Sequence, residues 1–207
     1  MREIVICTHG LWLKAWVMKP LSRYLSAHGH ECKLFSYHSV SCSPKQNALK
    51  LGEFVDKLDA DIIHFVGHSL GGIILLNYFQ IFDTAKPGCV VMLGTPLSGS
   101  NIVRHISKSN FIKTRMLGES SKTLLGNVPV WKGIRPLAIF AGTRGVGIGR
   151  MLGISLDKPN DGIVAVSETK IDNCTLHIQV PYGHTGMLLA KSVAASVDEF
   201  LRTGNVT

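Results

Sequence analysis

One stretch of the sequence constrains the fold more than any other: DIIHFVGHSLGGIILL, residues 61–76. Its first half is an apolar run of strand length, and its second half is apolar on every side, as expected of a buried helix. Between the halves, Ser69 stands in Gly67-His68-Ser69-Leu70-Gly71, with a glycine two residues before it and another two residues after it. A turn this tight leaves almost no room for side chains at those flanking positions. The stretch therefore predicts a serine placed on a sharp strand-to-helix turn.

Similar apolar runs recur along the chain and predict the sheet to which this strand belongs. Six segments have the length and β-branched content of strands: EIVIC, ECKLFSY, DIIHFVG, CVVMLG, PLAIFAG and TLHIQV. Several lack polar alternation, which is typical of strands covered on both faces. Helical patterns separate them, at 20–29, at 44–58, at 70–82 and after GHTG, where the apolar face is formed by Leu189, Val193, Val197 and Phe200. The alternation predicts an α/β fold with about six mostly parallel strands flanked by helices.

The composition fits one such domain, residues 1–207. Apolar residues make up 45% of the chain and charged residues 17%, which excludes a disordered or fibrous protein. The start, MREIVICTHG, has the pattern of a strand rather than of a secretory signal, and no apolar run approaches the ~20 residues needed to span a bilayer. Five scattered cysteines without a C-x-x-C pair predict reduced thiols. We expect a cytoplasmic protein.

The formal charge of +8 comes mostly from one segment, residues 98–135. It carries one acid, Glu119, against these basic residues: Arg104, Lys108, Lys113, Arg115, Lys122, Lys132 and Arg135. No aromatic-interleaved RNA-binding motif accompanies them, so no nucleic-acid partner is expected. Connections of this length are often lids, although a surface helix is the alternative, and ISKSNFIKTRMLG is the clearest helical piece. We expect a basic lid insertion that favours anionic or interfacial substrates and contacts an anionic membrane surface.

The serine of the pattern G-x-S-x-G needs a base and an acid to become a nucleophile, and both are expected later in the chain. Among the nine histidines, His184 alone follows the last predicted strand, in the glycine-flanked loop PYGHTGMLL. Asp161 stands in the turn-like PNDG before it and preserves the order Ser, Asp, His. Asp157 is the reserve choice, and Glu168 is the third acid of that region. The sequence thus predicts Ser69, Asp161 and His184 as catalytic residues.

An oxyanion formed at this serine would need two backbone donors. The first is the N–H of Leu70, the residue after the nucleophile. The second is the N–H of Leu11 in THGLW, at the end of the first strand. We expect Gly10 to let that loop turn so that the Leu11 N–H points inward, and His9 to shape the loop rather than to transfer protons.

Together these pieces resemble the α/β-hydrolase superfamily, and within it the small lipase-like and esterase-like members. HGLW, GHSLGG, LGTPLSGS, NDGIV and GHTGMLL occur in the order of lipase signatures and cover most of the chain. The pattern is similar both to the minimal bacterial lipases and to the inositol-deacylase-like group. The resemblance implies Ser69, Asp161 and His184 as a triad and the Leu11 and Leu70 N–H groups as the oxyanion hole. It implies a serine hydrolase that cleaves small-molecule or lipid carboxylic esters through an acyl-enzyme.

Several alternatives stay open beside the intracellular esterase. A thioesterase or an acyltransferase would use the same triad, and a noncatalytic module would dock on anionic lipid or nucleic acid through the basic segment. The stretch GTRGVGIGR begins a dinucleotide-binding pattern at Gly145 and Gly147, but Arg150 occupies its last glycine position. No H-E-x-x-H spacing occurs either. We therefore expect neither cofactor nor metal.

Overall fold

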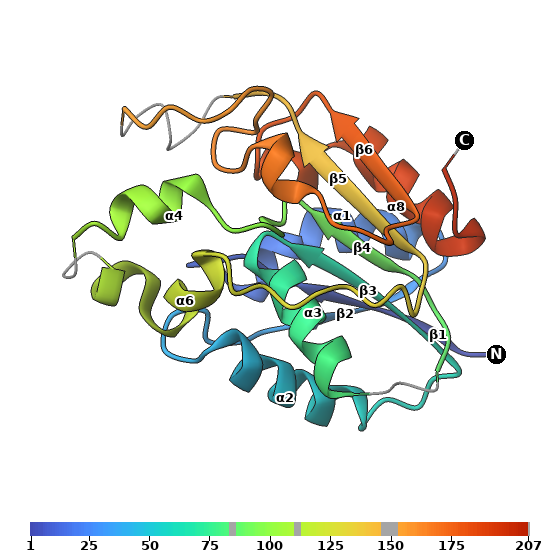
Figure 1. Ribbon diagram of the computed structural model, residues 1–207. Coiled ribbons are helices and arrows are strands. Elements are labelled where there is room, and N and C mark those ends of the chain that lie inside the picture. The colour runs from blue at the N-terminus through green and yellow to red at the C-terminus, as the bar shows by residue number, and fades with distance from the viewer. Residues whose placement is uncertain (83–85, 110–112, 146–152, 207) are drawn as a thin grey trace.

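The computed structural model describes residues 1–82, 86–109, 113–145 and 153–206. Six strands form one sheet in the order β2-β1-β3-β4-β5-β6, and every neighbouring pair is parallel (Figure 1). The strands are β1 Glu3–Thr8, β2 Glu31–Phe35, β3 Ile62–His68, β4 Val90–Leu93, β5 Leu137–Gly142 and β6 Leu176–Val180. Each coincides with one of the predicted apolar runs. The α/β class and the parallel sheet are thereby confirmed.

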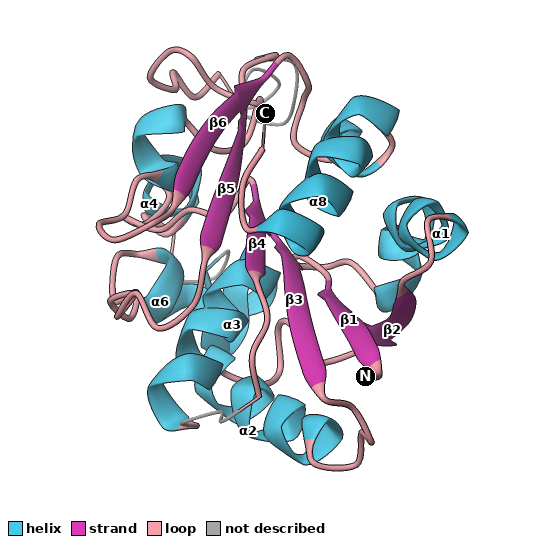
Figure 2. Ribbon diagram, turned by 90° about the vertical axis from the view of Figure 1, so that its right-hand side faces the viewer, coloured by secondary structure: helices cyan, strands magenta, loops and turns pink. Residues whose placement is uncertain are grey.

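Helices cover both faces of the sheet (Figure 2). The four longest are α1 Lys19–Ala27, α2 Pro44–Val55, α3 Leu70–Ile81 and α8 Lys191–Thr203. Side chains alternate across a strand, so β1 sends Ile4 and Ile6 into the cluster with α2 and α3, and Val5 and Cys7 into the cluster with α1 and α8. The strands therefore carry apolar residues at successive positions because both faces are buried, as their lack of polar alternation predicts.

The predicted helices begin and end at physically recognisable positions. Ser43 caps α2 by accepting a hydrogen bond from the Gln46 N–H at 3.2 Å, and the Gln46 side chain accepts from the Ser43 N–H at 2.8 Å. Gly204 ends α8 in the left-handed conformation, with φ of 73°. One expectation for the last helix is wrong. Leu189 precedes α8 instead of belonging to its apolar face, and it is 67% exposed.

The first part of the segment 98–135, up to Leu124, lies beyond the carboxyl ends of the strands, on the left in Figure 1, and the rest runs back to the start of β5. It contains α4 Asn101–Ile106, η2 Lys113–Leu117, η3 Gly118–Ser120 and α6 Ser121–Leu124. The helix expected over ISKSNFIKTRMLG is wrong in its described part, because α4 ends at Ile106, and 110–112 lie outside the described residues. Gly118, the last residue of this stretch, has φ of +51°, a left-handed conformation that an α-helix does not contain.

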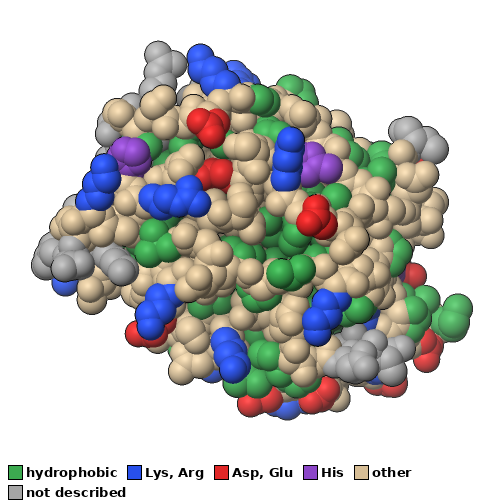
Figure 3. Space-filling model, viewed as in Figure 1, with side chains coloured by type: hydrophobic (Ala, Val, Ile, Leu, Met, Phe, Trp, Pro, Cys, Tyr) green, Lys and Arg blue, Asp and Glu red, His purple; other side chains and the backbone are tan. Residues whose placement is uncertain are grey.

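One residue counted with the basic segment belongs to the core instead. Arg135 is only 8% exposed. Its guanidinium donates to the carbonyl of Ile63 at 2.7 Å and to the carbonyl of Lys86, and it lies 5.2 Å from the centre of the Phe79 ring. Its charge is therefore absent from the surface of the segment. In Figure 3, the basic side chains on the visible face lie singly among acidic and hydrophobic ones.

Two further expectations concern the cysteine thiols and membrane-spanning helices. All five cysteines are free thiols. Within the described ranges, no helix combines the length and the apolar character that crossing a membrane would require.

Candidate active site

Ser69 occupies the predicted turn between β3 and α3. Its backbone has φ of 55° and ψ of −122°, a conformation that residues with a side chain rarely adopt. Its N–H donates to the carbonyl of Leu93 at 2.9 Å, which ties the turn to the neighbouring strand β4. Strained backbone of this kind persists only when the surrounding structure holds it, and it concentrates at functional sites.

The glycines around Ser69 are required by space. A Cβ atom on Gly67 would lie 2.7 Å from the Gly72 nitrogen, and one on Gly71 would lie 2.5 Å from the Thr8 carbonyl oxygen. Real Cβ atoms do not approach backbone atoms this closely, so the helix could not start directly above the strand with any other residue type. The reason given by the sequence for both glycines is confirmed.

His184 and Asp161 form a hydrogen-bonded pair beside this turn. Nδ1 of His184 lies 2.7 Å from Oδ2 of Asp161, and the His184 N–H donates to the Asp161 carbonyl at 3.0 Å. Oδ1 of Asp161 accepts from the N–H groups of Ile163 at 2.9 Å and Val164 at 2.7 Å. Because a carboxylate without its proton only accepts hydrogen bonds, Nδ1 of His184 carries the hydrogen and Nε2 presents a lone pair. The predicted acid and base are thus neighbours, both buried.

Ser69 and His184 line the same pocket, together with Gly10, Leu11 and Leu70. Four of the five predicted site residues thus share one pocket, and the fifth, Asp161, adjoins it through its hydrogen bond to His184. Over the described part of the chain, no direct hydrogen bond joins the Ser69 hydroxyl to His184. Catalytic hydrogen bonds are often long before substrate binds, so this geometry is compatible with proton transfer between the two residues.

The two predicted oxyanion donors are free to bind a ligand. Leu70 is the first residue of α3, where a backbone N–H has no partner inside the helix. Within the described ranges, no hydrogen bond of the protein uses the N–H of Leu70 or that of Leu11. Both residues line the pocket beside Ser69. A helix N-terminus also favours negative charge, which suits a developing oxyanion.

The expected reason for Gly10 needs correction. Gly10 does not adopt a left-handed conformation, whereas Trp12 does, with φ of 58°. A Cβ atom on Gly10 would lie 3.0 Å from Cβ of Ser69, so glycine is needed here for the close approach of the two loops. His9 supports the loop as expected. Its ring stacks on Tyr37 with centroids 4.1 Å apart, and burial lowers its pKa, which keeps it neutral.

The pocket above Ser69 has a volume of about 410 Å³, which suits a small organic ligand. Most of its wall is apolar: Leu11, Trp12, Leu13, Leu70, Pro96, Ile102, Val103, Ile106, Met116, Leu117, Leu124, Ile163 and Val164. Among the described residues, no lysine, arginine, aspartate or glutamate lines it. The pocket is therefore built for an apolar group next to the serine.

The segment 98–135 supplies a large part of that wall. Ile102, Val103 and Met116 belong to it, whereas Arg104 and Arg115 on the same segment are exposed. Trp12 connects it to the loop that carries Leu11, because its indole N–H donates to the Met116 carbonyl at 2.6 Å. The Trp12 backbone N–H donates to the Ser39 hydroxyl at 3.0 Å. In this structure the segment forms part of the pocket wall.

The two other acids considered from the sequence lie elsewhere. Asp157 is exposed, and its carbonyl accepts a hydrogen bond from the Asn160 side chain. Glu168 is buried, and its carboxylate accepts from the N–H groups of Asn101 at 2.5 Å and Ala165 at 2.8 Å. Burial raises the pKa of Glu168. Its contacts hold the segment 98–135 against the loop after β5, which is a structural role.

A neighbouring histidine had no role assigned from the sequence. His68 precedes Ser69, is fully buried and lines the pocket. Its Nε2 lies 3.1 Å from the carbonyl oxygen of His184. Its position inside G-x-S-x-G was the only sequence signal, and that signal does not reveal which residue the ring contacts.

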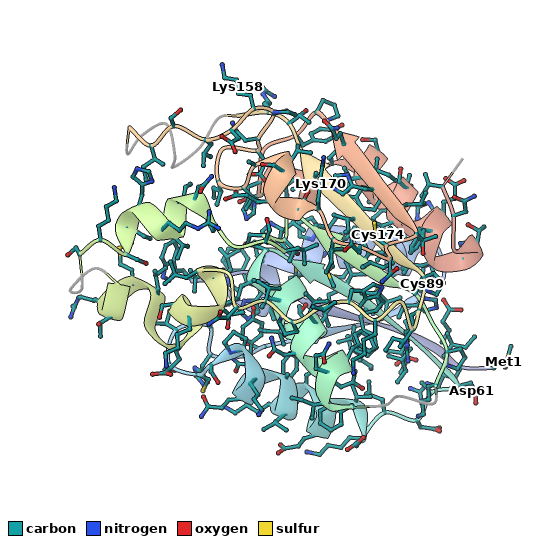
Figure 4. The ribbon with its side chains drawn as sticks, in the orientation of Figure 1. Met1, Asp61, Cys89, Lys158, Lys170 and Cys174 are labelled. Carbon is teal, nitrogen blue, oxygen red and sulfur yellow. The ribbon has the colours of Figure 1, made fainter. Side chains whose placement is uncertain are left out.

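A second hollow of about 580 Å³ lies apart from this site and contains none of the predicted residues. Lys170 and Cys174, which line it, come from the segment between η4 (Val166–Thr169) and β6, as Figure 4 shows. Its lining mixes apolar and polar side chains: Leu97, Val128, Pro129, Val130, Lys170, Ile171, Asp172, Cys174 and His177. In the described part of the chain, no group of three or more His, Cys, Asp or Glu residues could hold a metal ion. The glycines at 146–150 lie outside the described residues.

Comparison with solved structures identifies the fold as that of the α/β hydrolases. The mature lipase BlEst2 of Bacillus licheniformis superposes with a TM-score of 0.75 at 16% identity, over 99% of this chain and 93% of that one. The metagenomic carboxyl esterase MGS0156 gives 0.71 at 18% identity, over 87% and 64%. The monoacylglycerol lipase of Paleococcus ferrophilus gives 0.62 at 13% identity, over 98% and 95%. No family model and no curated protein sequence matches the chain.

Proposed function

We propose that the protein is a serine hydrolase that cleaves carboxylic esters with an apolar acyl or alcohol group. One observation carries the proposal: a strained serine at the start of a helix shares an apolar pocket with a histidine that is hydrogen-bonded to a buried aspartate. The likeness to proteins named lipases and esterases supports the same activity. The coincidence of these features favours acyl transfer over noncatalytic binding.

Each side chain has a definite part in the proposed reaction. Nε2 of His184 takes the proton of the Ser69 hydroxyl, and the serine oxygen attacks the ester carbonyl. The negative charge that develops on the carbonyl oxygen is stabilised by the N–H groups of Leu11 and Leu70. His184 then donates the proton to the leaving alcohol, and the acyl group stays on Ser69. Water, deprotonated by His184, attacks the acyl-enzyme, and the acid leaves as the Ser69 oxygen takes the proton from His184.

Asp161 keeps His184 productive throughout this cycle. Its Oδ2 accepts from Nδ1–H, which fixes the tautomer and stabilises the imidazolium that forms during each proton transfer. The N–H groups of Ile163 and Val164 hold the other carboxylate oxygen, so the acid cannot rotate away from the histidine.

The test compares the protein with its Ser69→Ala variant. We expect a fluorophosphonate probe to label the protein at Ser69 and p-nitrophenyl esters of graded chain length to be hydrolysed. The variant should lose labelling and at least ~10³-fold in kcat, because the nucleophile is gone. Circular dichroism and thermal unfolding serve as the control for folding. Retained ester turnover by a folded Ser69→Ala variant would refute the assignment.

The segment 98–135 is proposed to act as the cover of this site and to rest on a lipid surface when the substrate is a lipid ester. Its inner side lines the pocket with apolar residues, and Arg104, Lys108 and Arg115 are exposed on it. No charged side chain of the described segment enters the pocket, so nothing from the segment would pair with an anionic substrate there. The apolar inner side and the basic outer side of the segment therefore favour interfacial over anionic substrates. Charge reversal at Lys108 and Arg115 should weaken sedimentation with vesicles containing phosphatidylserine and leave hydrolysis of soluble neutral esters unchanged.

A further inference from the structure

We propose that His68 is a positioning residue that holds the loop of His184 in place for proton transfer with Ser69. This inference rests on the proposed function and assigns a further side chain to the same site. His68 is the last residue of β3, so a rigid central strand fixes its backbone beside the nucleophile.

The contacts of His68 lead directly to the base. Its Nε2 lies 3.1 Å from the His184 carbonyl oxygen, and the centroids of the two rings are 4.7 Å apart at an interplanar angle of 50°. A carbonyl oxygen only accepts hydrogen bonds, so Nε2 of His68 carries the hydrogen and donates it. Asp161 holds the imidazole of His184 through Nδ1 and its backbone N–H. His68 therefore adds the hydrogen bond to the one remaining backbone group of that residue, its carbonyl.

The ring of His68 also contacts the loop of the predicted oxyanion donor. A Cβ atom on Gly10 would lie 3.2 Å from Nδ1 of His68, which shows how closely this loop packs on the ring. A single buried side chain thus separates and spaces three parts of the site: the turn of Ser69, the loop of Leu11 and the loop of His184. In enzymes generally, displacement of the reacting groups by about 1 Å can lower the rate by roughly 10²-fold.

The neutral state of His68 suits this position. Burial, with a further contribution from the charge of His184, lowers the pKa of His68 to about 3. Its ring therefore stays uncharged when His184 takes up the serine proton, whereas a cation there would oppose that step. Nδ1 of His68 is buried without a hydrogen-bond partner among the described residues. An apolar side chain would avoid this unpaired atom, and the hydrogen bond to His184 explains why an imidazole stands there instead.

Three variants separate the hydrogen bond from the packing of the ring. The side-chain amide of His68→Gln reaches the position of Nε2 and can donate to the His184 carbonyl. In His68→Asn the amide is too short to reach it, and His68→Phe fills the space without any donor. The matched control is His64→Asn on the same strand. His64 accepts the Cys89 N–H at Nδ1, at 3.0 Å, which the asparagine oxygen can replace, and it lies away from Ser69.

The measurements are kcat and KM for a p-nitrophenyl ester and the rate of fluorophosphonate labelling. We expect His68→Phe and His68→Asn to lower kcat and the labelling rate about 10- to 100-fold, with KM within threefold, because the base is displaced while the apolar pocket remains. His68→Gln should stay within about fivefold of the unmodified protein. His64→Asn should keep kcat within twofold even where its melting temperature falls.

Two results would overturn the inference. One is an unchanged kcat in folded His68→Asn or His68→Phe, and the other is a loss in His68→Gln as large as in His68→Asn. If His68→Phe does not fold, the comparison of glutamine with asparagine still decides, because both are polar and differ in reach. An unmodified protein that neither hydrolyses esters nor reacts with the probe would instead contradict the proposed function itself.

Discussion

The polar groups at the amino ends of the strands, here called the amino edge of the sheet, differ in their pairing from those at the carboxyl ends, the carboxyl edge. At the amino edge they are paired: His30 lies 3.0 Å from a Glu3 oxygen and 2.6 Å from an Asp198 oxygen, and Arg2 pairs with Glu31 at 3.0 Å. Met1, Asp61 and Cys89 mark this edge on the right of Figure 4. At the carboxyl edge, the N–H groups of Leu11 and Leu70 and the Nε2 of His184 have no partner within the described ranges.

The difference shows where the protein uses its polar groups for stability and where it keeps them available. A buried charge without a partner lowers the free energy of unfolding. The pairing at the amino edge avoids this loss of stability. Unpaired donors beside a strained serine lower stability, and they are retained where a ligand can complete them. Substitutions at the two edges should therefore change different measurable quantities.

The largest expected effect is on activity, at Asp161. In Asp161→Asn, the amide can keep accepting from Ile163 and Val164 but donates toward Nδ1 of His184, which forces the wrong tautomer. We expect kcat to fall by about 10³- to 10⁴-fold with little change in melting temperature. Steady-state hydrolysis of p-nitrophenyl butyrate measures kcat, and a thermal melt measures the melting temperature.

Glu168→Gln is the matched control, because Glu168 is the other buried carboxylate that accepts two backbone N–H groups near the site. It should keep kcat within threefold and lose about 1–2 kcal/mol of free energy of unfolding. An Asp161→Asn variant as active as Glu168→Gln would contradict the role given to Asp161.

The next effect concerns stability alone, at the amino edge. His30→Ala removes one partner from Glu3, which keeps His64, and one from Asp198, which keeps Arg202. We expect a loss of about 1–3 kcal/mol in the free energy of unfolding. The lower end of that range reflects the partial exposure of the two carboxylates. Urea denaturation measures the loss, and kcat of the folded variant should stay within twofold. A large fall in kcat would show that the two edges are coupled.

The smallest effect is a gradual loss of stability in acid. Burial lowers the pKa of His68 to about 3 and that of His64 to about 4, both below the value of about 6.5 in the unfolded chain. Between these values the unfolded state binds more protons, so stability falls as the pH falls below about 6.5. Each histidine contributes a slope of up to about 1.4 kcal/mol per pH unit.

Urea denaturation at pH 7.5 and pH 6.0 tests this effect. We expect the unmodified protein to be about 1–2 kcal/mol less stable at the lower pH. His64→Asn should reduce the difference, because one of the two histidines no longer titrates in the unfolded chain. The same pH dependence with and without His64 would assign the effect to other groups.

Several features of the site follow from local sequence. The strands are predictable because an apolar run of five or six residues between turns has few other stable environments in a parallel sheet. The turn at Ser69 is predictable because the positions of Gly67 and Gly71 leave no space for a Cβ atom. His184 and Asp161 follow from chain order, since the carboxyl ends of parallel strands meet at one edge of the sheet.

The segment 98–135 was less predictable, because its helices are short and are held by tertiary contacts rather than by their own periodicity. Its pattern suggested one helix over ISKSNFIKTRMLG, whereas Glu168 and Trp12 hold separate pieces against the pocket. Its charge was also overestimated, since the guanidinium of Arg135 is buried against backbone carbonyls.

The sequence by itself therefore determined the class of fold, the strained serine turn and the candidate partners of that serine, because backbone sterics and chain order act over a few residues or along a sheet edge. Only the tertiary structure decided that Gly10 is needed for its approach to Ser69, that Arg135 lies in the core, and that His68 contacts the carbonyl of His184. Such contacts join residues as far apart as 116 positions, and no local pattern encodes the distance between them.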